Sequence, residues 1–193
     1  PSPGVVLCHG FTGIKEWLLA PFANAFARAG ITSLTFDYRR FGRSEGERGK
    51  LVPADQVDDI RNAVTFLSGL PGVDPARIGL WGTSFGGGNV LVAGAIDPRV
   101  KAVVSQVPFG SGKRLLESQG ADGAIAEIVA ADRARRVTEG KGERLPASMF
   151  AGEELRTYFE RAYAEYRELA IDLELATVDR IAGWIPELYV PML

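Results

Sequence analysis

Short apolar runs alternate with helical segments over the first 110 residues, and this alternation limits the folds open to the chain. The apolar runs are rich in branched side chains and are bounded by turn-forming residues, which predicts strands buried on both faces. They lie at residues 4–8, 31–36, 77–81 and 100–104.

Three helical segments separate the predicted strands. Apolar residues recur at helical spacing in residues 22–29 and 53–68, and a third helix is expected over residues 85–96. Glycine or proline follows closely after each of them, as is common where helices end. Because strand–helix–strand crossovers join parallel strands, this part of the chain predicts an α/β fold with a mostly parallel sheet and helices on both faces.

Composition excludes several classes of protein. The 193 residues carry a formal net charge of -2, so no basic surface points to a nucleic-acid partner. No apolar run reaches the roughly 18 residues that would predict a membrane span. One cysteine and one histidine exclude a disulfide framework and make a poor ligand set for a metal, and no cofactor is suggested.

The ends of the chain carry little information. It begins Pro-Ser-Pro, without a methionine or a signal pattern, which we interpret as a cut end. A cytoplasmic location is therefore a default expectation, and a homo-oligomer is neither indicated nor excluded.

Residues 82–86 match the pattern G-x-S-x-G, between a predicted strand and a predicted helix. A sharp turn in this context exposes a serine hydroxyl above the sheet, so Ser84 is the predicted nucleophile. The alternative is a glycine-rich turn that happens to contain a serine. A phosphate-binding loop is not supported, because the glycine and lysine pattern of such loops is missing.

A second glycine-bracketed loop, residues 9–13, follows the first predicted strand. Loops at the carboxyl ends of parallel strands converge, so the backbone N–H groups of Phe11 and Phe85 are predicted to form an oxyanion hole. We expect the ring of His9 to hydrogen-bond local backbone rather than to act as a base. Cys8 is expected to be a small buried hydrophobic residue.

The second half of the chain differs in pattern. Residues 111–186 are expected to form a helical cap without strands, and residues 187–193 the start of a further core strand. Aromatic residues of this half are candidates either for lining an apolar substrate pocket or for packing the cap on the core. They are Phe150, Phe159, Tyr163, Tyr166 and Trp184.

Three signatures in order resemble the α/β-hydrolase superfamily: residues 9–11, residues 37–44 and residues 82–87. The middle one is similar to the D-x-R-G-x-G-x-S loop of that superfamily, with Arg40 where glycine is usual. The chain looks most like the dienelactone-hydrolase and serine-aminopeptidase-like branch, which includes hydrolases and acyltransferases of polyketide-type esters. The resemblance predicts an α/β-hydrolase core over residues 1–110.

The resemblance also implies roles. Ser84 matches the nucleophile, and Phe11 and Phe85 match the oxyanion donors. In this superfamily an acid and then a histidine follow the serine, but no histidine follows Ser84 here. We therefore expect the acid and the histidine to lie outside these 193 residues, which would form a hydrolase domain without its two ends. The weak substitutes for the acid are Asp97, Asp172 and Asp179.

The sequence thus predicts a serine hydrolase that cleaves an ester-type acyl bond of a small-molecule substrate through an acyl-enzyme. An acyltransferase or a peptidase would use the same serine. A non-catalytic binding protein of the same fold is the alternative from another class.

Overall fold

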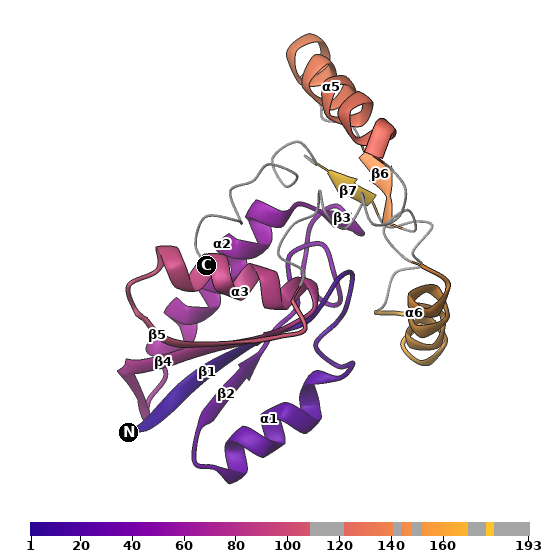
Figure 1. Cartoon of the computed structure of the whole chain (residues 1–193). Coiled ribbons are helices and arrows are strands. Elements are labelled where there is room, and N and C mark those ends of the chain that lie inside the picture. The colour runs from indigo at the N-terminus through magenta and orange to yellow at the C-terminus, as the bar shows by residue number, and fades with distance from the viewer. Residues whose placement is uncertain (109–121, 141–143, 148–151, 170–176, 180–193) are drawn as a thin grey trace.

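The computed structural model describes residues 1–108, 122–140, 144–147, 152–169 and 177–179 (Figure 1). Four parallel strands form its main sheet, in the order β2-β1-β4-β5. The strands are β1 (Ser2–Cys8), β2 (Thr32–Thr35), β4 (Val73–Thr83) and β5 (Val100–Gln106).

Helices cover both faces of this sheet. Figure 1 shows α1 (Leu19–Arg28) on one face and both α2 (Pro53–Ser68) and α3 (Phe85–Ile96) on the other. The predicted α/β class is therefore confirmed, and the helix predicted over 85–96 has the observed bounds. Strand β4 is longer than expected at both ends. Asp74 and Pro75 hide the apolar pattern at its start, and Gly82 and Thr83 extend it beyond the apolar run at its end.

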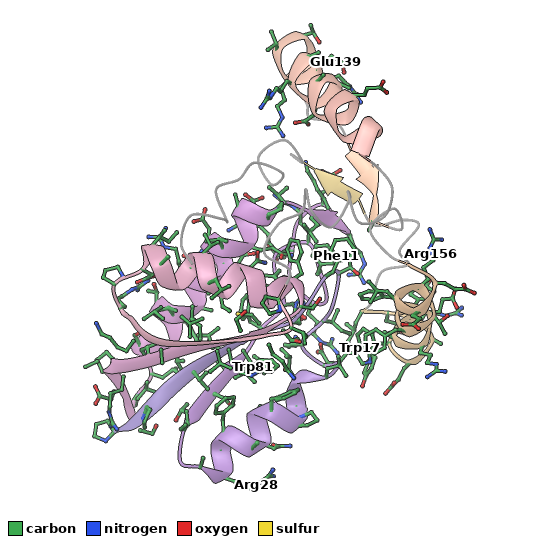
Figure 2. The ribbon with its side chains drawn as sticks, in the orientation of Figure 1. Phe11, Trp17, Arg28, Trp81, Glu139 and Arg156 are labelled. Carbon is green, nitrogen blue, oxygen red and sulfur yellow. The ribbon has the colours of Figure 1, made fainter. Side chains whose placement is uncertain are left out.

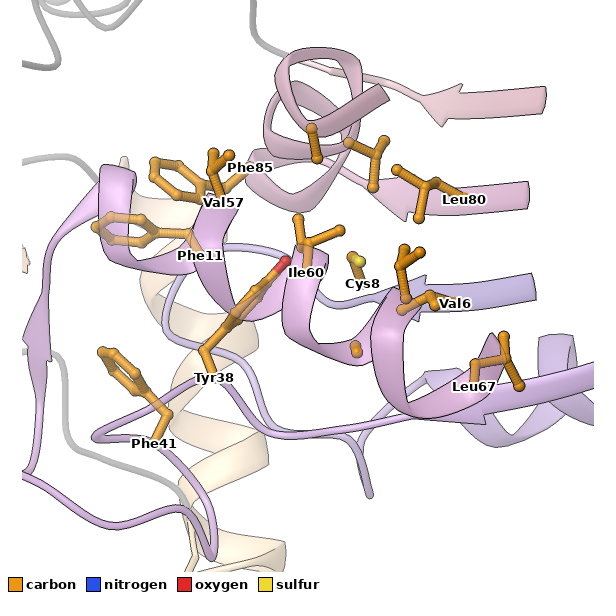
Figure 3. Close-up of a cluster of buried hydrophobic side chains, with 14 of the residues drawn as sticks. Val6, Cys8, Phe11, Tyr38, Phe41, Val57, Ile60, Leu67, Leu80 and Phe85 are labelled. Carbon is orange, nitrogen blue, oxygen red and sulfur yellow. The ribbon is translucent and has the colours of Figure 1, made fainter. Parts of the chain in front are cut away.

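The side chains of β1 explain why both faces must be covered. Val5 and Leu7 point to the α1 side, where they pack with Leu19 and Trp81. The intervening Val6 and Cys8 belong to the larger cluster under α2 and α3 (Figure 3). Successive strand residues alternate between faces, so a continuous apolar run can be buried only inside a layered fold.

A second, three-stranded sheet corrects the expectation that the second half has no strands. It has the order β3-β7-β6, with β3 parallel to β7 and β6 antiparallel to it. Its strands are β3 (Lys50–Leu51), β6 (Arg144–Pro146) and β7 (Thr177–Asp179). Strands of two or three residues are too short to show an alternating pattern in sequence, which is why they were missed.

Two helices of the second half are described, α5 (Asp122–Glu139) and α6 (Glu153–Glu165). Helix α6 buries Phe159 and Ala162, which are three residues apart and therefore lie on one face of the helix. The boundaries predicted at residues 110 and 186, and the strand predicted at 187–193, lie outside the described residues. The division into core, cap and further strand therefore stays a prediction.

The register of the main sheet brings two loops together. Cys8 of β1 is level with Gly82 of β4, and Gly82 is level with Ser105 of β5. The loop that follows β1 and the turn that follows β4 therefore leave the same edge of the sheet side by side.

Candidate active site

Ser84 occupies the sharp turn between β4 and α3. Its backbone has φ 54° and ψ -120°, a conformation that residues with side chains rarely adopt, and the residue is exposed. Two hydrogen bonds hold the turn: the N–H of Ser84 donates to the carbonyl of Gln106 at 2.9 Å, and the N–H of Gly88 donates to the carbonyl of Ser84 at 3.2 Å. The strand–turn–helix context predicted for this serine is observed.

The glycines on either side of Ser84 are required by close backbone contacts. A Cβ atom on Gly82 would lie 2.6 Å from the carbonyl carbon of Gly86. A Cβ atom on Gly86 would lie 2.6 Å from the carbonyl oxygen of Cys8. Real Cβ atoms do not come so close to backbone, so the G-x-S-x-G pattern records the packing of α3 against the end of β1.

The loop after β1 lies directly beside the serine. A Cβ atom on Gly10 would lie 3.3 Å from the Cβ and 3.7 Å from the Oγ of Ser84. The rings of Phe11 and Phe85 are 5.7 Å apart, so the two residues predicted as oxyanion donors are neighbours. The structure thus brings all three predicted site residues together.

His9 is held inside this loop. Because a carbonyl only accepts, Nδ1 carries the proton and donates it to the carbonyl oxygen of Gly10 at 3.0 Å. The ring packs edge-on against Tyr38, with centroids 4.6 Å apart. Burial lowers the pKa of His9, outweighing the hydrogen bond to Gly10, so the ring is neutral. The expected bond to local backbone is confirmed.

Asp37 connects this loop to the loop after β2, a link that sequence reasoning missed. Its carboxylate accepts hydrogen bonds from the backbone N–H of Lys15 at 2.8 Å, the Lys15 ammonium at 2.5 Å and the N–H of Arg43 at 3.0 Å. Burial alone would raise the pKa of Asp37, but these bonds hold it below its usual value. The partners are 22 and 6 residues away in sequence, so only the motif at 37–44 signalled the position.

Cys8 has no reactive character. It is fully buried, and burial raises the pKa of its thiol to about 12. The thiol is therefore protonated at neutral pH and packs as a small hydrophobic side chain, as predicted.

Asp97 is at the wrong end of α3 to assist Ser84. It follows the last residue of the helix, where Arg99 and Arg61 bind its carboxylate, with Nη2 of Arg99 at 2.6 Å. Ser84 precedes the first residue of the same helix. The whole length of this 12-residue helix, about 18 Å, therefore separates Ser84 from Asp97. Asp172 lies outside the described residues, and only the backbone of Asp179, in β7, is described.

A cavity of about 150 Å³ opens beside Ser84. Its walls come from the loop after β1, the start of α1 and the helix α6. Of the five aromatic candidates, Phe159 lines it, Tyr163 and Tyr166 do not, and Phe150 and Trp184 lie outside the described residues. The lining residues are His9, Gly10, Phe11, Gly13, Trp17, Leu18, Leu19, Thr83, Ser84, Leu155, Tyr158 and Phe159.

Neither a metal site nor a membrane span is found in the part of the chain that the structure describes. Among those residues, no group of three or more His, Cys, Asp or Glu side chains is placed to hold a metal ion. No helix among them is long and apolar enough to cross a bilayer.

The parallel sheet and the strained serine turn define an α/β hydrolase, and solved structures of that class are similar. The crystal structure of the α/β hydrolase GrgF from Penicillium sp. sh18 matches with a TM-score of 0.64 and 26% identity, over 94% of this chain and 62% of that one. The chain belongs to the serine aminopeptidase family, S33, whose profile matches residues 1–149.

Curated proteins are also similar to this chain. An Escherichia coli protein described as an uncharacterized 31.7 kDa protein in the traX-finO intergenic region is 41% identical over 183 residues. The match covers 91% of this chain and 63% of that relative, so the chain spans less than two thirds of its length. Thiohydrolase aneE of Aspergillus aculeatus is 41% identical over 109 residues, which cover 56% of this chain and 34% of the relative. Polyketide transferase claH of Penicillium crustosum is 42% identical over 109 residues, which cover 56% of this chain and 35% of the relative, so the predicted resemblance to polyketide-associated hydrolases and acyltransferases is confirmed.

Proposed function

We propose that the protein is a serine hydrolase in which Ser84 attacks an ester-type carbonyl. The observation that carries the proposal is the position of Ser84, held in a strained turn, exposed, and in contact with the loop after β1 at the mouth of a cavity. Strain of about 1–3 kcal/mol persists only where the surrounding fold imposes it, and such strain gathers at functional sites.

The backbone N–H groups of Phe11 and Phe85 form the oxyanion hole in this proposal. Phe85 is the first residue of α3, where the N–H groups point out of the helix and the helix dipole favours negative charge. Phe11 lies beside it on the neighbouring loop. Losing one such donor costs roughly 3–4 kcal/mol of transition-state stabilisation, so both donors together contribute much of the rate.

The base and the acid come from chain outside these 193 residues. His9, the one histidine in the sequence, is neutral and buried, and its Nδ1 proton is given to Gly10. The external histidine takes the proton of the Ser84 hydroxyl, the bond to the leaving alcohol breaks, and the alcohol receives that proton. Water then hydrolyses the acyl-serine to release the acid and restore Ser84.

The test is a burst assay on the full-length protein with p-nitrophenyl butyrate, read by released nitrophenol and by intact mass. We expect one acyl group per protein and its loss in Ser84→Ala. Acylation that survives Ser84→Ala would refute the proposal.

Transfer to an alcohol instead of water uses the same acyl-enzyme. Relatives of both kinds match, because thiohydrolase aneE is named for hydrolysis and polyketide transferase claH for transfer. Adding a primary alcohol during turnover and measuring ester against acid separates the two, and the same assay with anilide substrates tests for a peptidase.

A further inference from the structure

The cavity beside Ser84 has an apolar wall made of two segments that are far apart in sequence. One is the segment that leads into α1, which contributes Trp17 and Leu18, and the other is α6. We infer that this cavity is the acyl pocket, and that it selects an apolar acyl group about the size of a benzene ring. The inference rests on the proposed function of Ser84.

Three aromatic rings build the wall facing the serine. The ring of Trp17 lies 4.2 Å from that of Tyr158 and 5.7 Å from that of Phe159, and the latter two are 5.8 Å apart. Figure 2 shows Trp17 beside α6. Rings in tilted and edge-on contact form a stable apolar surface, which suits an alkyl or aryl group and disfavours a charged one.

The wall is also fixed at the end of α6. The guanidinium of Arg48 donates to the carbonyl oxygen of Leu169 at 2.6 Å and to that of Glu168 at 3.2 Å. The same group donates to the carbonyl of Gly42 at 2.9 Å. Because one side chain joins the segment after α6 to a core loop, the distance across the cavity is set by the fold and can act as a size filter.

Leu18 lies in the wall at a conformational cost. Its φ is 73°, in the left-handed region that favours glycine, and its side chain lines the cavity. The surrounding fold imposes this conformation, and strain of this kind gathers at functional sites.

Proton chemistry decides which half of the substrate occupies the cavity. In the proposed mechanism the leaving alcohol receives its proton from the external histidine, which is not among the described residues that line the cavity. His9, the one histidine in that lining, donates its Nδ1 proton to the carbonyl oxygen of Gly10. The leaving group therefore faces the external histidine, and the acyl group, which needs no proton, occupies the apolar cavity.

The volume sets the size of that group. A cavity of about 150 Å³ has room for one benzene molecule, or about six carbon atoms. Each methylene buried in it should raise kcat/KM about fourfold until the cavity is full. Longer chains should then lose activity.

The test uses the full-length protein with p-nitrophenyl acetate, butyrate, hexanoate, benzoate and decanoate. We expect kcat/KM to be highest for hexanoate or benzoate. Tyr158→Ala opens the wall of the cavity, so it should raise kcat/KM for decanoate at least tenfold relative to kcat/KM for acetate. Leu155→Trp fills the cavity, so it should lower kcat/KM for hexanoate tenfold and change kcat/KM for acetate little.

Tyr163→Ala is the matched control, because it removes an aromatic ring from the same helix outside the cavity. Tyr158 and Leu155 are both more than a third exposed, so neither substitution should prevent folding, and circular dichroism checks this.

Three outcomes would overturn the inference. The first is an unchanged acyl-length profile in both variants while Ser84→Ala still abolishes turnover; this leaves the proposed function intact. The second is a shift confined to a series of hexanoate esters of different alcohols, which would assign the cavity to the leaving group. The third is turnover that survives Ser84→Ala, which removes the proposed function and the inference together.

Discussion

Gly10 lies against Ser84 so closely that a Cβ atom on residue 10 would be 3.3 Å from the Cβ of the serine. The loop after β1 and the nucleophile turn are therefore in contact through a position that has no side chain. Any displacement of this loop moves the N–H of Phe11 relative to the reacting carbonyl.

Gly10→Ala should lower kcat by about 10- to 100-fold with little change in KM. The added methyl pushes the loop by a few tenths of an ångström, which weakens a bond made in the transition state rather than in substrate binding. Steady-state kinetics with p-nitrophenyl butyrate measures this. Gly69→Ala is the control, since its Cβ would meet its nearest atom at an ordinary 3.5 Å. An equal loss in both variants would contradict the prediction.

Ser84→Gly should be more stable than Ser84→Ala by about 1–2 kcal/mol, although both are inactive. Only glycine adopts the φ of 54° without strain. Urea unfolding of the two variants gives the difference. At Ser68, in the last turn of α2, the alanine variant should be more stable than the glycine variant, because glycine in a helix only adds conformational entropy to the unfolded chain. Equal stability of the two Ser84 variants would argue against strain at the nucleophile.

Asp37 should make stability depend on pH near 4. Its carboxyl has a pKa lowered on folding, so it stabilises the protein above its unfolded pKa, and this stabilisation is lost as the pH falls through the folded pKa. Asp37→Asn should lower the free energy of unfolding by about 2 kcal/mol at pH 7, because the hydrogen bonds to the charged carboxylate weaken. It should also reduce the decline of the free energy of unfolding below pH 4.

Urea unfolding between pH 3 and pH 7 tests this. Asp58→Asn, on the exposed side of α2, is the control and should change stability by less than about 0.5 kcal/mol. A constant offset between Asp37→Asn and the parent protein across this range would contradict the assignment.

Arg40→Gly should be more stable than Arg40→Ala by about 1 kcal/mol. Arg40 has φ 74° where the superfamily usually has glycine, and both variants lose the same 2.6 Å ion pair with Asp55. The difference in thermal unfolding therefore reports the backbone strain alone. At Arg39, which has no positive φ, alanine should be the more stable replacement.

Cys8 should resist iodoacetamide at pH 8 in the folded protein and react in urea. A thiol pKa of about 12 leaves a thiolate fraction roughly a thousandfold below that of an ordinary cysteine. Intact mass over time measures the modification. Rapid labelling of the native protein, at a rate near that in urea, would refute the burial.

The sequence alone predicted the parts of this protein whose signal is local. The turn at Ser84 could be identified because its glycines, its strand and its helix are contiguous. Runs such as residues 4–8 predicted buried strands, since covered strands need apolar residues on both faces. The contact of Phe11 with Phe85 also followed, because parallel strands end at one edge of the sheet.

Tertiary structure decided what depends on residues that are distant in the chain. Nothing near Trp17 predicts that it stacks on Tyr158, and nothing near Lys15 predicts that it holds Asp37. The three-residue strand β7 is likewise stabilised by pairing with β3 on one side and β6 on the other, not by its own pattern. Local sequence determines which conformation each segment favours, whereas long-range packing and hydrogen bonds determine which segments meet, and here they form the cavity beside Ser84.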